Sequence, residues 1–409
     1  MINLGVCEAI FSSLKSLRVL DLHGKGLHIV PSSICKLKHL RYLDLSWNYQ
    51  IEKLPDSITR LPNLHTLRLS YCNGLKELPR GITKLVNLRH RYNDGCENLT
   101  YMPRGLGQLT GLQTLSKFVV HFDSAPKDGG RLSELNRLYS IRLGELKISE
   151  LRHGEDVAKD ANLKKNEHLQ VSRLRWSTKN VDAHDEKALE GLEPLPNLKK
   201  LYIDYYGGVR VPMWLLSLAN LIHLSLGNCR KLKYLQPSSR LRSLKSLYLN
   251  CPDEMEYVSD CSDNNDFSSS SSSALIEFFP SLEVIRLQWC PNLKGWWRTS
   301  DSSLLPSFPR LSNLTIREVP MLTSLPMFPH LQEDLYLRSA SWKPVQQTMM
   351  KNVNLSTTVE ASSSSSIPIV FSSAPLSKLK EIRLLHIGDI ETLPEDGLQN
   401  LISQVLGDI

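Results

Sequence analysis

The stretch from Leu37 to Leu109 contains one pattern three times in succession: LKHLRYLDLSWNYQIEKLPDSITRL, LPNLHTLRLSYCNGLKELPRGITKL and LVNLRHRYNDGCENLTYMPRGLGQL. The preceding residues, from Leu14 to Leu37, contain a further copy. A proline stands at the same point of each copy and recurs every 24 residues, as Pro31, Pro55, Pro79 and Pro103. This fixed period means that one structural unit is repeated along the chain and that each unit packs against its neighbours.

The apolar positions within one copy predict its local structure. Leu43 and Leu45 are two residues apart, which is the side-chain period of a β-strand, and Pro55 ends any strand before it. One such coil cannot enclose its own apolar face, but stacked coils can, because each strand then pairs with the next. The pattern L-x-x-L-x-L at this period predicts an α/β leucine-rich repeat solenoid. We expect parallel strands on its concave face, and short helices, 3-10 turns and irregular returns on its convex face.

The position that follows each strand carries a small polar side chain. Asn48 occupies it in one copy, and the in-phase residues of other copies are Cys72, Cys96, Cys229 and Cys290. This position turns the chain out of the strand, so these cysteines are interpreted as structural rather than as a disulfide framework. The 8 cysteines are spread out without a C-x-x-C pair. Reduced thiols in a cytoplasmic protein fit this usage best.

One copy departs from the pattern at two inward positions. Arg91 and Asn93 stand where the preceding copy has Leu67 and Leu69. An unpaired arginine in the core would cost several kcal/mol. Either the strand is locally displaced, or Arg91 extends its charged end to the surface. Local displacement is the favoured interpretation, and it predicts a weak point in the solenoid.

The repeats vary along the chain, but we predict a single solenoid over residues 1–409. Residues 1–13 are interpreted as the end of an earlier element, whose Ile10 and Phe11 could cover the first coil. Within the irregular part, we expect a short helix and then a strand in 132–151, a helix in 155–168 and a strand in 169–176. The predicted sections are regular repeats in 14–116, an irregular section in 117–194, repeats in 195–258, a Ser-rich loop in 259–275, repeats in 279–337, a second Ser-rich loop in 339–375, and truncated last repeats in 376–409.

Composition and motifs argue against several functions. The net charge of +7 is mildly basic, which is weak support for nucleic-acid binding, so no nucleic-acid partner is expected. No apolar run approaches the roughly 18 residues of a membrane span. The sequence has no G-x-x-x-x-G-K-[ST], H-E-x-x-H or G-x-S-x-G motif, and its 12 histidines are scattered. We therefore expect no enzyme activity, no cofactor and no metal site.

Side chains between the inward leucines should face solvent and form columns across the coils. Adjacent strands are about 4.8 Å apart, so one column is a positive stripe of roughly 15 Å. Arginine and tryptophan are favoured anchors of interfaces. Two interpretations remain open: an ordinary solvated face, or a docking site for an acidic segment. The candidate partner-binding residues are Arg18, Arg41, His65 and Arg89 in the first column, Arg68 in the next, and Trp47, Tyr71 and Trp289 just past the strands.

Several segments resemble the leucine-rich repeat region of plant disease-resistance proteins of the coiled-coil, NB-ARC, leucine-rich repeat class. They are LRVLDLHGKGLHIVPSSICKLKHLRYLDLSWNYQIEKLP, GCENLTYMPRGLGQLTGLQTLSKFVV and LEGLEPLPNLKKLYIDYYGGVRVPMWL, the last with a P-x-W turn. The resemblance implies a module that recognises pathogen effectors, directly or through a guarded host protein. It also implies that the repeats restrain a nucleotide-binding switch until an effector binds.

The resemblance also implies a partner for the arginine column. In this family an arginine cluster in the early repeats contacts an acidic motif on the coiled coil. Arg18, Arg41 and Arg89 match that column, whereas His65 departs from it. The sequence contains neither the coiled coil nor the NB-ARC domain. The alternative hypothesis is a stand-alone repeat adaptor that binds a cytosolic signalling protein.

Overall fold

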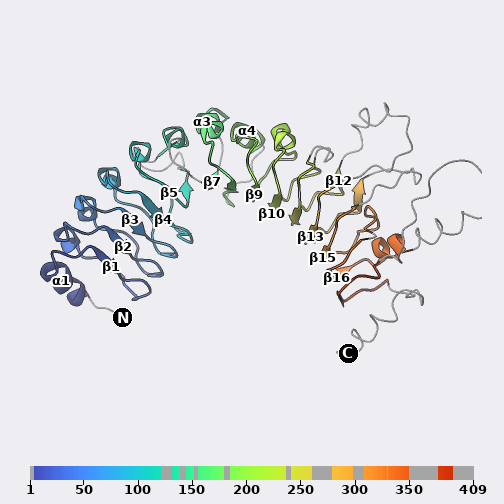
Figure 1. The fold of residues 1–409 in the computed structure, drawn as a ribbon, viewed down its shortest axis with the longest axis horizontal. Helices are drawn as coiled ribbons and strands as arrows, with labels where there is room; N and C mark the ends of the chain where they lie inside the picture. The colour runs from blue at the N-terminus through green and yellow to red at the C-terminus, as the bar shows by residue number, and fades with distance from the viewer. Residues whose placement is uncertain are drawn as a thin grey trace, which may run out of the picture. The chain divides into compact units, whose positions relative to one another are not determined.

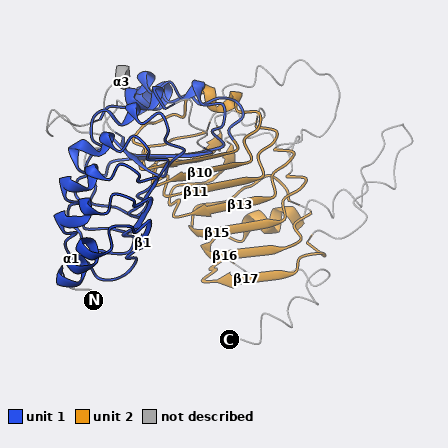
Figure 2. Cartoon of the chain, turned by 60° about the vertical axis from the view of Figure 1, so that its left-hand side comes forward, with its two compact units in different colours: residues 1–198 blue, residues 199–409 orange. Residues whose placement is uncertain are grey.

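The computed structural model places the chain in two compact units, residues 1–198 and 199–409 (Figure 2). The prediction of one solenoid over 1–409 remains a prediction, and each unit is described by itself. In both units the strands lie on one side of the stacked coils and the helices on the other (Figure 1). The structure describes residues 4–120, 130–138, 144–151, 155–178, 185–235, 241–259, 279–297, 308–328, 330–349 and 376–389.

Unit 1 begins with a helix and continues as a parallel sheet. Helix α1 (Leu4–Ser13) buries Cys7 and Phe11 against the first coil, as expected for Phe11. One sheet has the strand order β1-β2-β3-β4-β5, and β6, β7 and β8 pair in parallel. The strands are β1 (Val19–Asp21), β2 (Tyr42–Asp44), β3 (Thr66–Arg68), β4 (His90–Tyr92), β5 (Thr114–Leu115), β6 (Phe118–Val119), β7 (Glu145–Leu151) and β8 (Val171–Trp176).

Short helices return the chain from one strand of unit 1 to the next. Pro31 and Pro55 precede 3-10 helices in extended conformation, with φ −61° and −67°. Proline suits this position because it fixes φ and has no N–H to leave unbonded. The helices are η1 (Ser32–Lys36), η2 (Asp56–Arg60), η3 (Arg80–Lys84), η4 (Leu106–Gln108), α2 (Ser133–Asn136), α3 (Glu155–Asp160), η5 (Leu163–Lys165) and α4 (Asp185–Gly191).

Unit 2 repeats the same coil with longer strands. Its main strands pair in parallel from β9 to β17, and β12 pairs separately with β14. The 3-10 helix η6 (Met213–Ser217) again follows a proline, Pro212. The strands are β9 (Lys200–Asp204), β10 (His223–Gly227), β11 (Ser246–Asn250), β12 (Tyr257–Ser259), β13 (Val284–Gln288), β14 (Gly295–Trp297), β15 (Asn313–Val319), β16 (Asp334–Ala340) and β17 (Glu381–Leu385).

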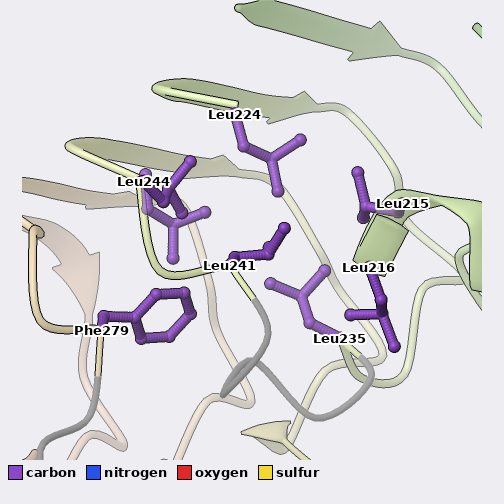
Figure 3. A pocket seen from close by; sticks show the side chains of 8 residues that line it. Leu215, Leu216, Leu224, Leu235, Leu241, Leu244 and Phe279 are labelled. Atoms are coloured by element: carbon purple, nitrogen blue, oxygen red, sulfur yellow. The ribbon is translucent and has the colours of Figure 1, made fainter. Parts of the chain in front are cut away.

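The inward leucines form the core of each unit. Leu43, Leu45 and Leu67 are 0% exposed, as the repeat pattern predicts. In unit 2, leucines from neighbouring coils and Phe279 surround a small cavity of about 10 Å³ (Figure 3). A space of this size with an apolar lining has no polar partner for a water molecule. The cavity is therefore a packing gap within the core.

The predicted turn position is a hydrogen-bonding ladder, as expected. The Asn48 side chain donates to the carbonyl oxygens of Leu22 at 2.9 Å and Leu45 at 2.7 Å, and it accepts from the Leu27 N–H. The Cys72 thiol donates to the Leu45 carbonyl at 3.1 Å in the same way. Cys96 and Cys229 make the equivalent contacts, and the described cysteines are free thiols. The structural interpretation of these cysteines is confirmed.

The expected displacement at Arg91 is wrong. Strand β4 keeps the register of its neighbours, with Arg91 paired to Leu67 on one side and to Leu115 on the other. The side chain is 0% exposed, so it does not extend to the surface either. Its Nη2 donates to the Met102 sulfur at 3.4 Å, whereas Nε and Nη1 have no hydrogen-bond partner among the described residues. The parallel hydrogen bonds of the flanking strands hold β4 in place and leave the guanidinium inside the coil.

The irregular section agrees with the sequence in its elements. Helix α2 precedes strand β7 within residues 132–151, as expected. Helix α3 and strand β8 also fall within their expected segments. The second Ser-rich loop begins later than residue 339, because β16 runs to Ala340 and residues 343–349 are helical. The Ser-rich parts of both loops lie outside the described residues.

Candidate partner-binding surface

Four candidate residues of unit 1 lie in one row that the backbone builds. The carbonyl oxygen of Arg18 accepts the Arg41 N–H at 2.7 Å, and that of Arg41 accepts the His65 N–H at 2.8 Å. The His65 carbonyl in turn accepts the Arg89 N–H at 2.8 Å. Each residue precedes the first residue of its strand, so the row follows the N-terminal edge of the sheet. We call Arg18, Arg41, His65 and Arg89 the arginine row.

The arginine row presents positive charge to solvent. Arg18, Arg41 and Arg89 are exposed, and none of them forms an ion pair with a described carboxylate. His65 is half-buried and interrupts the charged series. Because neighbouring strands are about 4.8 Å apart, Arg18 and Arg41 lie close enough for their side chains to contact one segment of a partner. The row therefore carries charge that the described parts of the chain do not neutralise.

Arg68 differs from the arginine row because its charge is already paired. Its Nε lies 3.1 Å from the carboxylate of Asp44, which is buried, and its guanidinium carbon lies 4.6 Å from the centre of the Tyr92 ring. Asp44 also accepts hydrogen bonds from the Tyr42 hydroxyl and the Ser46 N–H. Burial and the hydrogen bond from its hydroxyl to Asp44 raise the pKa of Tyr42. Arg68 thus contributes to a fixed network on the sheet.

Trp47 and Tyr71 form an exposed aromatic stack at the other end of the strands. Their ring centroids are 4.3 Å apart with an interplanar angle of 26°, and they are 40% and 43% exposed. Both have a left-handed backbone, with φ 62° and 61°. Glycine occupies the equivalent position at Gly24 and Gly95, where φ is 63° and 69°. Bulky residues are disfavoured in this conformation, so the aromatic side chains are held there at a backbone cost.

The stack is larger than the sequence indicated. His23 lies 6.2 Å and Tyr49 6.0 Å from Trp47, measured between ring centroids. His23 could have been found, because it lies one residue before Gly24, the counterpart of Trp47 in the preceding coil. Tyr49 lies two residues after Trp47, in the turn, where the repeat pattern gives no direction for a side chain. Sequence reasoning therefore missed both rings.

The candidate residues fall into separate groups. Arg41 and Trp47 are six residues apart along an extended segment, or roughly 20 Å, so the arginine row and the aromatic stack lie at opposite ends of the same strands. Trp289 belongs to unit 2, where it is 48% exposed and lies 5.9 Å from the guanidinium of Arg317. One small ligand cannot contact the arginine row and the aromatic stack together. An extended protein segment running along the strands could.

The described residues do not contain the elements of a metal centre. They include no group of three or more His, Cys, Asp or Glu side chains that could hold a metal ion. In the same described ranges, no helix has the length and apolar character needed to cross a membrane. The exposed groups described above are suited to contacts with another macromolecule.

The coils, their ladder residues and the comparisons with known proteins define the class of this chain. The family model described as "Leucine-rich repeat region" matches residues 6–288, so the chain belongs to the leucine-rich repeat family. Its curated relatives are plant disease resistance proteins, and their similarity fits the repeat region of the nucleotide-binding-site, leucine-rich repeat class.

Two relatives and one solved structure indicate the extent of the similarity. The chain is 38% identical over 387 residues to the disease resistance protein RGA1 of Solanum bulbocastanum, covering 85% of this chain and 39% of that protein. It is 37% identical to the disease resistance protein At3g14460 of Arabidopsis thaliana, covering 78% of this chain and 22% of that protein. An LRR protein of Leptospira interrogans matches with a TM-score of 0.36 and 21% identity, over 85% of this chain and 96% of that one. The chain thus spans about two fifths of the length of RGA1 and a smaller share of the length of At3g14460.

Proposed function

We propose that this chain is the non-catalytic recognition module of an intracellular plant immune receptor. In this proposal the module senses pathogen effectors, directly or through a guarded host protein, and restrains the nucleotide-binding switch of the receptor. The relatives support this proposal, because they are disease resistance proteins that the chain matches over most of its own length. The free thiols of the described residues are compatible with the reducing cytoplasm.

The arginine row is the observation that supports the proposed restraining contact. Arg18, Arg41 and Arg89 project from consecutive or nearby coils and keep their charge unpaired among the described residues. An acidic segment is the partner that complements such a row, because guanidinium groups bind carboxylates with two parallel hydrogen bonds. The proposed partner is an acidic segment on the coiled-coil domain of the receptor.

The test is binding of a coiled-coil domain supplied in trans. We expect the triple change Arg18→Glu, Arg41→Glu and Arg89→Glu to weaken the association by about tenfold or more, since interface charges of the wrong sign cost several kcal/mol. Isothermal titration calorimetry or a quantitative pull-down measures the difference. An unchanged affinity would remove the arginine row from the contact.

The chain offers a matched control on the other side of the same coils. Lys36, Arg60 and Lys84 are the basic residues in the last turns of η1, η2 and η3, and all three are exposed. Changing these three residues to glutamate alters the net charge by the same amount. If this control variant loses as much affinity as the first, the attraction is a general charge effect and the proposed contact fails.

A further inference from the structure

Unit 2 carries two arginines on neighbouring strands that the repeat pattern did not single out. Arg286 lies on β13 and Arg317 on β15, on the face of the sheet where side chains alternate with the buried leucines. Arg317 pairs in the parallel register with Gln288, which lies two residues after Arg286 on β13. Arg317 is therefore on the neighbouring strand, two residues further along the strand direction than Arg286. This diagonal separates the two Cα atoms by about 8 Å, from the ordinary strand spacing and rise.

An aromatic ring holds each of these guanidinium groups. The guanidinium carbon of Arg286 lies 4.8 Å from the centre of the Tyr248 ring, and that of Arg317 lies 5.9 Å from the Trp289 ring. Stacking on a ring fixes the plane of a guanidinium while its edge remains able to donate hydrogen bonds. Trp289 has φ 54°, a left-handed conformation that disfavours a bulky side chain. The two charges are therefore positioned before any partner arrives.

The other arginines of this face are neutralised, which distinguishes this pair. Arg338 lies 3.5 Å from the Glu318 carboxylate, and Arg383 lies 2.7 Å from Glu381. Among the described residues, neither Arg286 nor Arg317 has a carboxylate within ion-pair distance, and Arg286 attracts the half-buried Asp334 only at longer range. Nε of Arg317 is buried without a described hydrogen-bond partner. The face thus concentrates its unpaired positive charge at Arg286 and Arg317.

We propose that Arg286 and Arg317, held by Tyr248 and Trp289, form a second docking site that binds an acidic, extended segment of a partner protein. Charge complementarity selects the partner, because each guanidinium can donate two parallel hydrogen bonds to one carboxylate. In an extended segment, residues i and i+2 lie on one face about 6.6–7 Å apart, close to the diagonal of the two arginines. A Glu-x-Glu segment therefore matches the site, with one carboxylate for each arginine.

The test is the binding of a fluorescein-labelled peptide of alternating glutamate and glycine to the whole chain, measured by fluorescence anisotropy at low salt. We expect Arg286→Gln with Arg317→Gln to weaken binding by about tenfold or more, since two charge-assisted contacts are lost. The peptide with glutamine in place of glutamate should not bind. Equal binding of the wild type and the double variant would overturn the proposal.

A matched variant separates the site from general electrostatic attraction. Arg242 and Arg310 are exposed arginines of unit 2 that lie outside the strands. Changing both to glutamine removes the same charge, and we expect less than about a threefold loss of affinity. A loss equal to that of the first double variant would overturn the site. Tighter binding of a single-stranded oligonucleotide of equal charge would overturn the choice of a protein partner.

Chemical modification provides a measurement that needs no variant. Phenylglyoxal modifies arginine side chains, and mass spectrometry of the digested protein locates the modified residues. The glutamate peptide should protect Arg286 and Arg317 in the wild-type chain, whereas Arg242 should react as before. Unprotected Arg286 and Arg317 at a saturating peptide concentration would contradict the proposal. The site does not involve Arg18, Arg41 or Arg89, so this result is independent of the contact proposed for unit 1.

Discussion

Arg91 stands directly beside Leu67 in the parallel register of β3 and β4, and both side chains are fully buried. Burial lowers the pKa of the Arg91 guanidinium to about 10, so it keeps its charge at neutral pH. Its one described hydrogen bond goes to a methionine sulfur, which is a weak acceptor. The core of unit 1 thus contains a charge that its surroundings scarcely compensate.

Replacing Arg91 with leucine should stabilise the protein. The variant Arg91→Leu restores the apolar column between Leu67 and Leu115, and we expect a gain of about 1–4 kcal/mol, the range seen when buried charged groups are replaced by apolar ones. Thermal and urea denaturation measure it. Arg89→Leu is the control, because Arg89 is exposed and its replacement should change stability by less than about 0.5 kcal/mol. A lower melting temperature for Arg91→Leu would show that the guanidinium is needed in the core.

The hydrogen-bonding ladder predicts a ranking of substitutions at Asn48. Asn48→Ala removes the side-chain partner of the Leu27 N–H and of the Leu22 carbonyl, whereas the Leu45 carbonyl keeps its hydrogen bond from the Cys72 thiol. Each lost bond of a buried group costs about 1–3 kcal/mol. Asn48→Cys should cost less, because Cys72 satisfies the Leu45 carbonyl at the same position of the next coil. Urea denaturation measures the free energy of unfolding of each variant and so gives their order of stability. Equal losses for the alanine and cysteine variants would contradict the ladder.

The buried ladder thiols predict a loss of stability at alkaline pH. Burial raises the pKa of the Cys229 thiol from its ordinary value of 9.0 to about 12. Between these values the unfolded chain has released the thiol proton and the folded chain has not, so stability falls as pH rises. We expect a smaller loss for Cys229→Ser, because the hydroxyl does not titrate in this range. The melting temperature of the wild type and of Cys229→Ser, each measured as a function of pH, gives the two losses.

The same burial predicts slow reaction of these thiols. In the folded chain Cys229 and Cys290 should react more slowly with a disulfide reagent than the half-exposed Cys35, because only the thiolate reacts. Mass spectrometry locates the modified residues. Rapid labelling of Cys229 under conditions where the protein is folded would contradict its position in the core.

The aromatic stack predicts energetic coupling between Gly95 and Tyr71. A Cβ atom added to Gly95 would lie 2.5 Å from the Tyr71 ring, and φ at Gly95 is 69°. Gly95→Ala should therefore cost about 1–2 kcal/mol from backbone strain and an additional amount from displacing the ring. In a Tyr71→Ala background only the backbone part remains. A double-mutant cycle in denaturation experiments measures the difference, and full additivity would mean that the ring does not occupy this position.

Strictly periodic sequence was sufficient to predict the coils, because a leucine repeated at fixed spacing has one way to be buried. Leu43 and Cys72 therefore lie where the pattern places them. Arg91 also keeps the inward position of the pattern, against the expected displacement, because pairing with two regular strands outweighs the cost of one buried charge. The sequence also could not show that Asp44 pairs with Arg68 while Arg41 has no ion pair within the described parts of the chain. That outcome depends on which side chains adjacent coils bring within reach.

The amino-acid sequence by itself determined the repeat, its turn ladder and the position of the arginine row, since each follows from spacing along the chain. Only the tertiary structure decided which arginines remain unpaired. Arg286 and Arg338 look alike in the sequence, but one lies over Tyr248 and the other beside Glu318. Both contacts join residues of different coils, so the packing of the coils sets them. The physical reason is that burial follows a local period, whereas charge pairing depends on distances in space.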